Sequence, residues 1–199
     1  MEIQTLPESI ILENKVVLLR PLEITDIEHL LEFAIHEPEL WKYSLAQAGS
    51  EENMKKYISD AVFSRASGKE YAFIVFDKIK NRYAGSTRFY DIQLLYKTIQ
   101  LGYTWYGKEF QGTGLNKNCK YVLLEYAFEA LGMERVEFRA DNRNERSKAA
   151  MLSIGCTVDG VLRSNLPDNM GGRRDSIVLS ILKEEWFSDK REKLKLKLI

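Results

Sequence analysis

Hydrophobic positions along the chain change their spacing several times, and each change marks the boundary of an expected element. A short apolar run at residues 16–19 is expected to form the first strand. Helical spacing follows in residues 26–35, and again in residues 50–68, where Ser50 provides an N-cap and Gly68 a stop. We therefore expect one strand and two helices ahead of most of the sheet.

The middle of the chain turns to a β-rich composition and then back to a helical period. Residues 71–76, 83–90 and 98–106 are rich in β-branched and aromatic side chains, which favours three strands in an antiparallel meander. Residues 115–131 then repeat apolar side chains along one helical face, and Gly132 ends the helix. This order predicts a meander that leads into a long helix.

The last third of the chain predicts a second set of mixed elements. Alternating apolar and charged residues indicate a strand at 135–141, and a helix follows at 144–154. Two closing strands are expected at 156–162 and 176–182, joined by a turn at 169–172. We expect an α+β, or mixed α/β, fold with a mainly antiparallel sheet.

Length and composition predict the number of domains and the cellular compartment. A chain of 199 residues suits one domain, placed here at residues 1–183, and a C-terminal tail at 184–199 is expected to be helical. The 29 basic and 29 acidic residues balance, so we expect no nucleic-acid partner. Cys119 and Cys156 indicate neither a metal site nor a disulfide framework. With no long apolar run, these features predict a cytoplasmic protein without a membrane partner.

The loop at residues 111–116 runs directly into the third expected helix and is the most informative segment. Lys117 and Lys120 lie in the opening turns of that helix, and no acidic residue follows until Glu125. A helix N-terminus carries unpaired N–H groups and partial positive charge, which acidic side chains normally offset. Because glycines let a ligand approach the bare backbone, the segment predicts a local site for an anion such as phosphate.

Two other glycine-rich phosphate sites fit this chain less well. A dinucleotide-binding loop needs a third glycine where Lys117 stands, and the surrounding meander does not suit that fold. Residues 102–108 nearly match the sequence pattern of a nucleotide-triphosphate loop, but Glu109 replaces the hydroxyl residue that would hold magnesium. Both alternatives are therefore set aside.

The loop resembles the pyrophosphate signature of the GNAT acyltransferases, in which Gln or Arg is followed after two residues by Gly, and after one more by Gly or Ala. Gln111 and Gly114 match, whereas Asn116 stands at the last position. The order of expected elements from residue 16 to residue 186 also resembles this family. Within the family, the chain resembles the branch of ribosomal-protein N-terminal acetyltransferases. This likeness lies in short segments at residues 19–22, 102–105 and 160–163, and in Asn144 with Ser147.

This resemblance implies a GNAT-like sheet of six to seven mainly antiparallel strands flanked by helices, and an acetyl-CoA-dependent N-acetyltransferase that needs no metal. The implied acceptor is an amine, with a protein or peptide N-terminal amine favoured, and two copies can form a homodimer. Ser147 is the implied catalytic residue, as a proton donor or by positioning the sulfur. The implied cofactor-binding residues are Tyr103, Thr104, Trp105, Gln111, Gly112, Thr113, Gly114, Leu115, Asn116 and Asn144.

The general base and the acceptor stay open. Gln100 occupies a strand position where many relatives have glutamate, and Asp91, Asp159, Asp175 or a water relay are the substitutes. An α-amine, with a pKa of about 7.7–8.0, is an easier acceptor than a lysine, with a pKa of about 10.4. Small amines are an alternative acceptor. A non-catalytic acyl-CoA sensor, or an interaction domain that binds no CoA, is an alternative function.

Aromatic residues and two histidines complete the candidate set. The loop at residues 43–49 lies between the two early helices, where the resemblance implies that acceptor entry is shaped. Aromatic side chains either wall an acceptor pocket or belong to the core, namely Trp41, Tyr43, Tyr90, Trp105 and Tyr106. His29 and His36 share a helical face without further ligands, so we expect no metal there.

Overall fold

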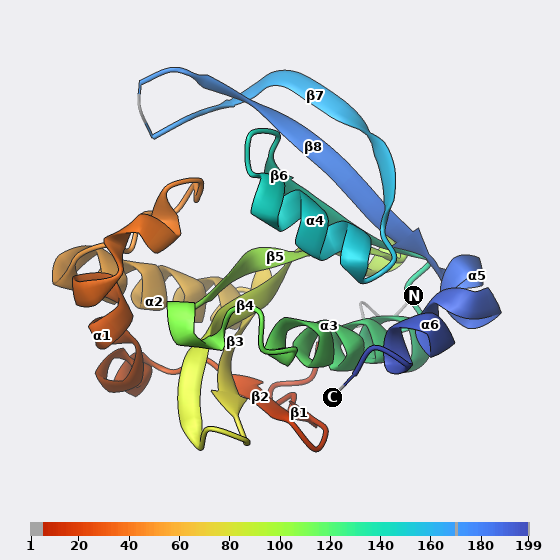
Figure 1. The fold of residues 1–199 in the computed structure, drawn as a ribbon, viewed down its shortest axis with the longest axis horizontal. Coiled ribbons are helices and arrows are strands. Elements are labelled where there is room, and N and C mark those ends of the chain that lie inside the picture. Colours follow the sequence, from red (N-terminus) through yellow and green to blue (C-terminus); the bar gives the residue numbers. More distant parts are fainter. Residues whose placement is uncertain (1–5, 170, 199) are drawn as a thin grey trace.

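The computed structural model describes residues 6–169 and 171–198, whose strands form one sheet in the order β1-β2-β3-β4-β5-β6-β8-β7 (Figure 1). The strands are β1 (Leu12–Glu13), β2 (Val17–Pro21), β3 (Glu70–Asp77), β4 (Arg82–Gln93), β5 (Thr98–Tyr106), β6 (Arg135–Asp141), β7 (Thr157–Pro167) and β8 (Arg173–Leu182). Neighbouring strands are antiparallel, except that β5 and β6 pair in parallel. The expected fold class is confirmed, with eight strands instead of six to seven because the short β1 joins the edge of the sheet.

The helices lie close to their predicted positions. They are α1 (Ile27–His36), α2 (Glu51–Ala66), α3 (Leu115–Glu125), α4 (Glu145–Ser153), α5 (Lys183–Glu185) and α6 (Arg191–Lys195), with short 3₁₀ or π turns η1 (Ile24–Asp26), η2 (Pro38–Trp41), η3 (Leu94–Tyr96), η4 (Lys108–Phe110), η5 (Tyr126–Ala130) and η6 (Trp186–Lys190). The long helix expected at residues 115–131 is therefore α3 followed by the π-helical turn η5.

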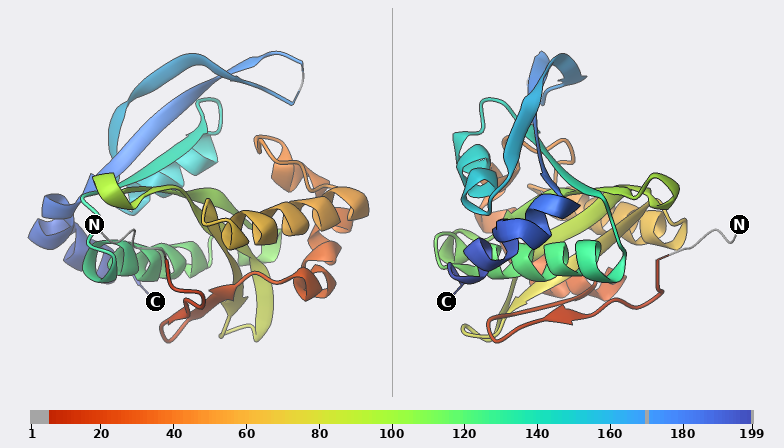
Figure 2. Two further views of the ribbon diagram at one scale, coloured as in Figure 1. Left: turned by 180° about the vertical axis from the view of Figure 1, so that it is seen from behind. Right: turned by 90° about the vertical axis from the view of Figure 1, so that its right-hand side faces the viewer.

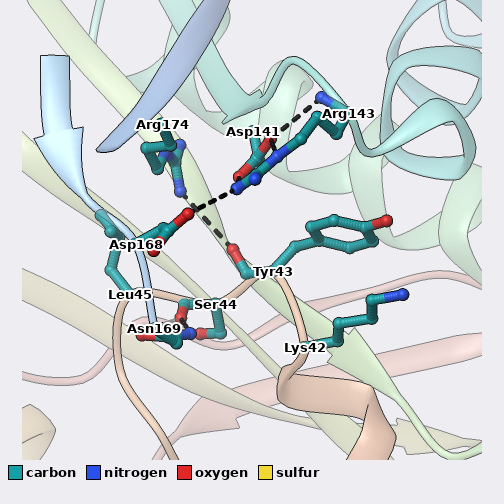
Figure 3. Close-up of a pocket in the computed structure, with 9 residues that line it drawn as sticks. All are labelled: Lys42, Tyr43, Ser44, Leu45, Asp141, Arg143, Asp168, Asn169 and Arg174. Carbon is teal, nitrogen blue, oxygen red and sulfur yellow. Dashed lines mark hydrogen bonds and ion pairs between the residues drawn. The ribbon is translucent and has the colours of Figure 1, made fainter. Parts of the chain in front are cut away.

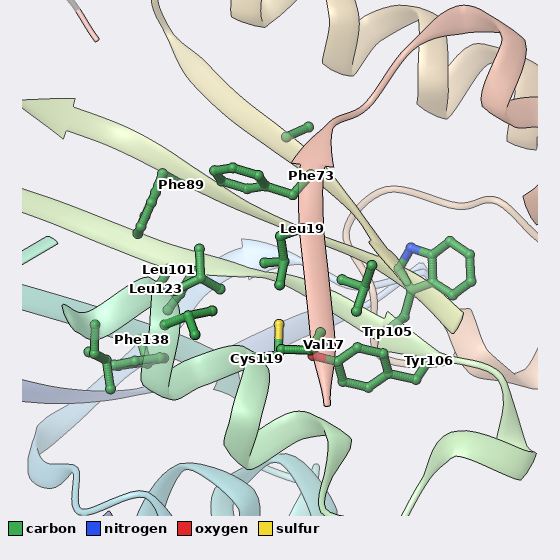
Figure 4. Close-up of a cluster of buried hydrophobic side chains, with 14 of the residues drawn as sticks. Val17, Leu19, Phe73, Phe89, Leu101, Trp105, Tyr106, Cys119, Leu123 and Phe138 are labelled. Carbon is green, nitrogen blue, oxygen red and sulfur yellow. The ribbon is translucent and has the colours of Figure 1, made fainter. Parts of the chain in front are cut away.

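Adjacent side chains of β5 point to opposite faces of the sheet, and each face has its own helices (Figures 2 and 4). Trp105 packs edge-on against Phe33 of α1, and its indole N–H donates to Tyr57 of α2 at 3.3 Å. Tyr106 turns the other way and contacts Cys119 of α3. The sheet thus lies between α1 and α2 on one side and α3 on the other.

The core between α3 and the sheet fixes the position of that helix. Leu19, Phe73, Phe89 and Leu101 come from four neighbouring strands, and Leu123 comes from α3; all five are almost fully buried (Figure 4). Each such side chain contributes about 1.5–3 kcal/mol through burial. Packing along its whole apolar face holds α3 with its N-terminus at the end of β5.

The C-terminal segment packs into the core instead of lying free. Trp186 is fully buried and stacks on Phe128 with 5.5 Å between ring centroids, and Leu194 of α6 is also buried. Phe187, which follows Trp186, is 52% exposed. Residues 1–5 and Ile199 lie outside the described part of the chain.

The β7–β8 hairpin is longer than expected and projects beyond the rest of the sheet (Figure 1). The strand expected at 156–162 extends to Pro167 as β7, and the strand expected at 176–182 already begins at Arg173 as β8. The added residues are mostly polar and exposed, so they carry no alternating pattern that would reveal a strand. The turn that joins the strands includes Met170, which lies outside the described residues.

Candidate active site

Strands β5 and β6 pair at one end and then separate. Their parallel pairing covers Thr98 to Gln100 of β5, and no later residue of β5 pairs with β6 within the described chain. Main-chain N–H and C=O groups along this side of β5 are therefore available to an extended ligand that adds to the strand edge. Residues 103–105, which the sequence implicates in cofactor binding, lie in this unpaired half.

Tyr103 marks the separation with an unusual backbone. Its φ of 49° lies in the left-handed region, which is uncommon for a residue other than glycine. The register between β4 and β5 shifts opposite it, as at a β-bulge. The ring lies edge-on to Tyr90 at 5.1 Å, and the Arg88 guanidinium lies 4.3 Å from its centroid. These contacts hold a strained bend at the mouth of the opening, as is common at functional sites.

Side chains of the next two residues point into the protein, so only their main chain faces the opening. The Thr104 hydroxyl contacts Thr87 at 2.8 Å and accepts from Lys120 at 2.6 Å. Trp105 is buried among the aromatic rings of α1 and α2. A ligand at this edge would therefore meet backbone groups held in place by side chains on both faces.

The N-terminus of α3 has the features of an anion site. Gly112 and Gly114 adopt φ values of 75° and 87°, and Gly114 is the N-cap, so no side chain caps the helix. The first turn contains no acidic residue. Thr113 instead donates to the carbonyl of Phe110 at 2.8 Å, which closes the loop. Asn116 is half-buried, and within the described structure its side chain makes no hydrogen bond. The Leu115 N–H donates to the Thr113 hydroxyl at 3.4 Å. The N–H groups of residues 112–114 and 116 make no hydrogen bond within the described structure and are left for a ligand.

Gln111 connects the unpaired edge of β5 with the N-terminus of α3. Its Nε2 donates to the carbonyl of Tyr106, the last residue of β5, at 2.8 Å. Its Oε1 accepts a hydrogen bond from Arg146 in the first turn of α4. Sequence analysis missed Arg146, since nothing in its local pattern indicates a contact 35 residues away. The end of β5, the start of α3 and the start of α4 therefore meet at one glutamine.

Asn144 and Ser147 stand at the start of α4. Asn144 Oδ1 accepts from the main-chain N–H of Ser147 at 3.0 Å, which is the hydrogen bond of an N-cap. This leaves the Asn144 Nδ2 group without a hydrogen-bonded partner in the described structure, and the half-buried Ser147 hydroxyl is equally uncommitted. Both side chains therefore retain polar groups for a ligand.

Lys120 lies in the second turn of α3, as expected, but its side chain points to the sheet and not to the helix N-terminus. It is 5% exposed, and its ammonium donates to Thr104 at 2.6 Å and to Thr87 at 3.2 Å. Burial lowers its pKa to about 8, and no described carboxylate forms an ion pair with it. The helix turns this side chain toward β4 and β5, because position 120 lies on the sheet-facing side of α3. Lys117 remains partly exposed.

The three aspartates considered as general bases all have structural partners. Asp91 accepts from Gln100 at 2.7 Å, and Asp175 accepts from a main-chain N–H at 2.7 Å. Burial favours a higher pKa for Asp159, but hydrogen bonds from Arg135 and Ser180 outweigh it, and the pKa of Asp159 is lowered. None of these carboxylates is therefore singled out as a base.

A cavity of about 200 Å³ lies at the end of β6, beneath the β7–β8 hairpin (Figure 3). Its lining residues are Lys42, Tyr43, Ser44, Leu45, Asp141, Arg143, Asp168, Asn169 and Arg174. Arg143 pairs with Asp141 at 2.7 Å and with Asp168 at 3.2 Å. Hydrogen bonds from Arg143 lower the pKa of Asp141, so this carboxylate stays ionised. The hairpin and the loop after η2 meet here, where Asn169 donates to the carbonyl of Ser44.

The aromatic candidates divide between this cavity and the core. Tyr43 lines the cavity, whereas Trp41, Trp105 and Tyr106 are buried in the core. His29 stacks on Tyr83 with ring centroids 4.2 Å apart. Across residues 6–169 and 171–198, no cluster of three or more His, Cys, Asp or Glu side chains is arranged to hold a metal ion. The same residues contain no helix with the length and apolar character needed to cross a bilayer.

Comparison with known proteins agrees with this geometry. The model of the acetyltransferase (GNAT) domain matches residues 17–157. YdaF of Bacillus subtilis, provisionally named a ribosomal N-acetyltransferase, is 28% identical over 183 residues, which cover 89% of this chain and 97% of YdaF. A crystal structure from T. thermophilus, provisionally named an acetyltransferase, is 30% identical with a TM-score of 0.86 and covers 99% of this chain and 100% of its own.

A more distant structure extends the likeness in fold. Mycobacterium smegmatis RimJ, solved in complex with CoA-disulfide, has a TM-score of 0.77 at 18% identity and covers 94% of this chain and 93% of its own. The matched domain includes β5, the loop before α3 and the start of α4, where the separated strands and the open helix N-terminus lie. The chain therefore belongs to the GNAT family and is an N-acetyltransferase.

Proposed function

We propose that this protein transfers an acetyl group from acetyl-CoA to the N-terminal α-amine of a peptide or protein, directly within a ternary complex. One observation carries the proposal: the unpaired edge of β5 and the glycine-capped N-terminus of α3 are joined through Gln111. CoA combines an extended amide-bearing arm with a diphosphate, and these two surfaces suit the two parts.

Each part of the site then has a defined task. Acetyl-CoA, when bound, supplies an acetyl group activated as a thioester. Main-chain N–H groups of residues 112–116 would hold the diphosphate, whereas the N–H of Gln111 already donates to the carbonyl of Lys108. Arg146 adds positive charge beside them. Main-chain groups of residues 103–105 and the free amide of Asn144 would hold the arm. Ser147 positions the sulfur or returns a proton to it, for which a weak acid suffices because a thiol has an ordinary pKa of about 8.5.

The acceptor class is supported by the finding that Asp91, Asp159 and Asp175, the three aspartates considered as bases, all have structural partners. An α-amine has a pKa of about 7.7–8.0, so a useful fraction is neutral near pH 7.5 without a dedicated base. A lysine side chain, with a pKa of about 10.4, would need one. The provisional name of YdaF, ribosomal N-acetyltransferase, supports an acceptor that belongs to a large assembly and not a small free amine. The free, buried Cys119 and Cys156 suit a reducing cytoplasm.

The experiment combines CoA binding with thiol release. CoA at 100 times its dissociation constant should add about 2.7 kcal/mol to the free energy of unfolding. Thiol release from acetyl-CoA is then measured with peptides, lysine derivatives and small amines, and mass spectrometry locates the acetyl group. Preferential acetylation of peptide N-termini supports the proposal. Tight CoA binding with no release on any acceptor would indicate a sensor, and preference for small amines would replace the acceptor class.

A further inference from the structure

The cavity beneath the β7–β8 hairpin contains a buried arginine that forms no ion pair with a described carboxylate. Asp141 is near enough to Arg174 to interact electrostatically, but its carboxylate is bonded to Arg143. Arg174 has two neutral partners: its Nε donates to Ser176 at 3.2 Å, and its Nη1 reaches the carbonyl of Tyr43 at 3.5 Å, the limit of a hydrogen bond. Its Nη2 donates to no described group, and Arg174 is one of the residues that line the cavity (Figure 3).

A cation in this position requires a partner. Arg174 is 6% exposed, and a buried charge without a paired counter-ion is costly. Burial lowers the pKa of Arg174, but a guanidinium stays protonated near neutral pH, so its charge persists. Lys42 adds a second cation at the rim, where it lies 5.3 Å from the Tyr43 ring centroid. The cavity therefore offers unpaired positive charge to a ligand.

The cavity lies next to the proposed reaction centre. Asp141, which lines it, is the last residue of β6, the strand that separates from β5. Arg174 and Tyr103, the residue at the bend of β5, are close enough to interact electrostatically. A group bound at Arg174 would therefore belong to the acceptor, whose amine points into the opening between the strands. The cavity of about 200 Å³ is smaller than the sites of drug-sized ligands and suits a single residue.

Resting on the proposed function, we propose that Arg174 binds a carboxylate of the acceptor and thereby selects amines that carry a carboxylate close to the reacting nitrogen. Two sources share this chemistry. One is an acidic side chain at the start of a peptide, and the other is the α-carboxylate of a free amino acid. A bidentate hydrogen bond from the guanidinium to the carboxylate would fix the direction of the amine.

The test compares acceptors that differ by one charge. Peptides that begin with glutamate or aspartate are paired with their glutamine or asparagine counterparts, and free amino acids are paired with their amides. We expect the wild type to prefer the charged member at least about 10-fold in kcat/KM. Arg174→Met should remove this preference by raising the KM for charged acceptors about 10- to 100-fold, with the KM for acetyl-CoA unchanged.

The matched control is Arg173→Met, because Arg173 is the exposed neighbour on the opposite face of β8 and should leave the preference intact. A preference confined to acidic peptides identifies the side chain as the source. A preference confined to free amino acids identifies the α-carboxylate and replaces the peptide acceptor of the proposed function. Equal use of charged and neutral acceptors by the wild type, or a preference that survives in Arg174→Met, overturns the inference while leaving N-acetylation standing. CoA binding without acetylation of any acceptor overturns both.

Discussion

Replacing Lys120 by methionine should stabilise the protein near neutral pH. The lysine ammonium lies between α3 and the sheet, 5% exposed, with two threonine hydroxyls as its hydrogen-bond partners. Methionine keeps an unbranched side chain of similar length but carries no charge. The hydroxyls of Thr87 and Thr104 lie 2.8 Å apart and can still bond each other. The substitution therefore removes a buried charge without leaving these hydroxyls unpaired.

The magnitude follows from the lowered pKa of Lys120. A lysine with an ordinary pKa of 10.5 that falls to about 8 on folding costs the folded state roughly 3 kcal/mol while it is charged. Below about pH 8 the side chain is protonated in both states, and the full cost applies. Between about pH 8 and 10.5 the folded protein releases the proton first, so the cost fades as pH rises. Allowing for the lost hydrogen bonds, Lys120→Met should gain about 1–3 kcal/mol at pH 7.

Urea denaturation of the wild type and Lys120→Met at several pH values between 7 and 10.5 provides the assay. The difference in unfolding free energy should shrink across this range, because titrations common to both proteins cancel. Lys117→Met is the control, since Lys117 lies on the same helix but is partly exposed. That control should change stability by at most about 0.5 kcal/mol. A less stable Lys120→Met at pH 7, or a difference independent of pH, would refute this account of Lys120.

Three further substitutions address the candidate site. Gly114→Ala places a Cβ at a φ of 87°. It should therefore lower the free energy of unfolding by about 1–2 kcal/mol and reduce the thermal stabilisation by CoA. A CoA-dependent shift in Tm as large as that of the wild type would contradict the role of the loop. Asn144→Ala removes the N-cap of α4 and should lower the urea-unfolding free energy by about 1 kcal/mol, whereas unchanged stability would show that the cap contributes nothing. Ser147→Ala should lower turnover with little effect on CoA affinity, measured by steady-state kinetics and calorimetry, and unchanged turnover would remove Ser147 from the mechanism.

Local patterns were sufficient for most elements near the site. The strands expected at 98–106 and 135–141 match β5 and β6 residue for residue. The first segment is rich in β-branched and aromatic side chains, and the second alternates in polarity. The glycine-rich loop indicated an open helix N-terminus, because positive φ at Gly112 and Gly114 is a local property of the backbone. The two-residue β1 and the polar part of the β7–β8 hairpin were not predicted, because neither has a periodic pattern of hydrophobic residues.

Side-chain partners distant in sequence required the assembled fold. Arg146 reaches Gln111 only because α4 starts beside the end of β5, and Arg174 faces the cavity only because the hairpin lies over β6. The sequence correctly placed Lys120 in the opening turns of the helix, but only the packing of the apolar face of α3 shows that its side chain turns toward the sheet.

By itself, the sequence determined the order of strands and helices, the loop that can receive a diphosphate, and the balanced charge that makes any anion site a local one. Tertiary structure alone decided that β5 and β6 separate after three paired residues and that one arginine stays buried without a paired counter-ion. The physical reason is that periodicity fixes which face of an element is buried, whereas charge pairing and strand separation depend on the relative positions of elements far apart in the chain.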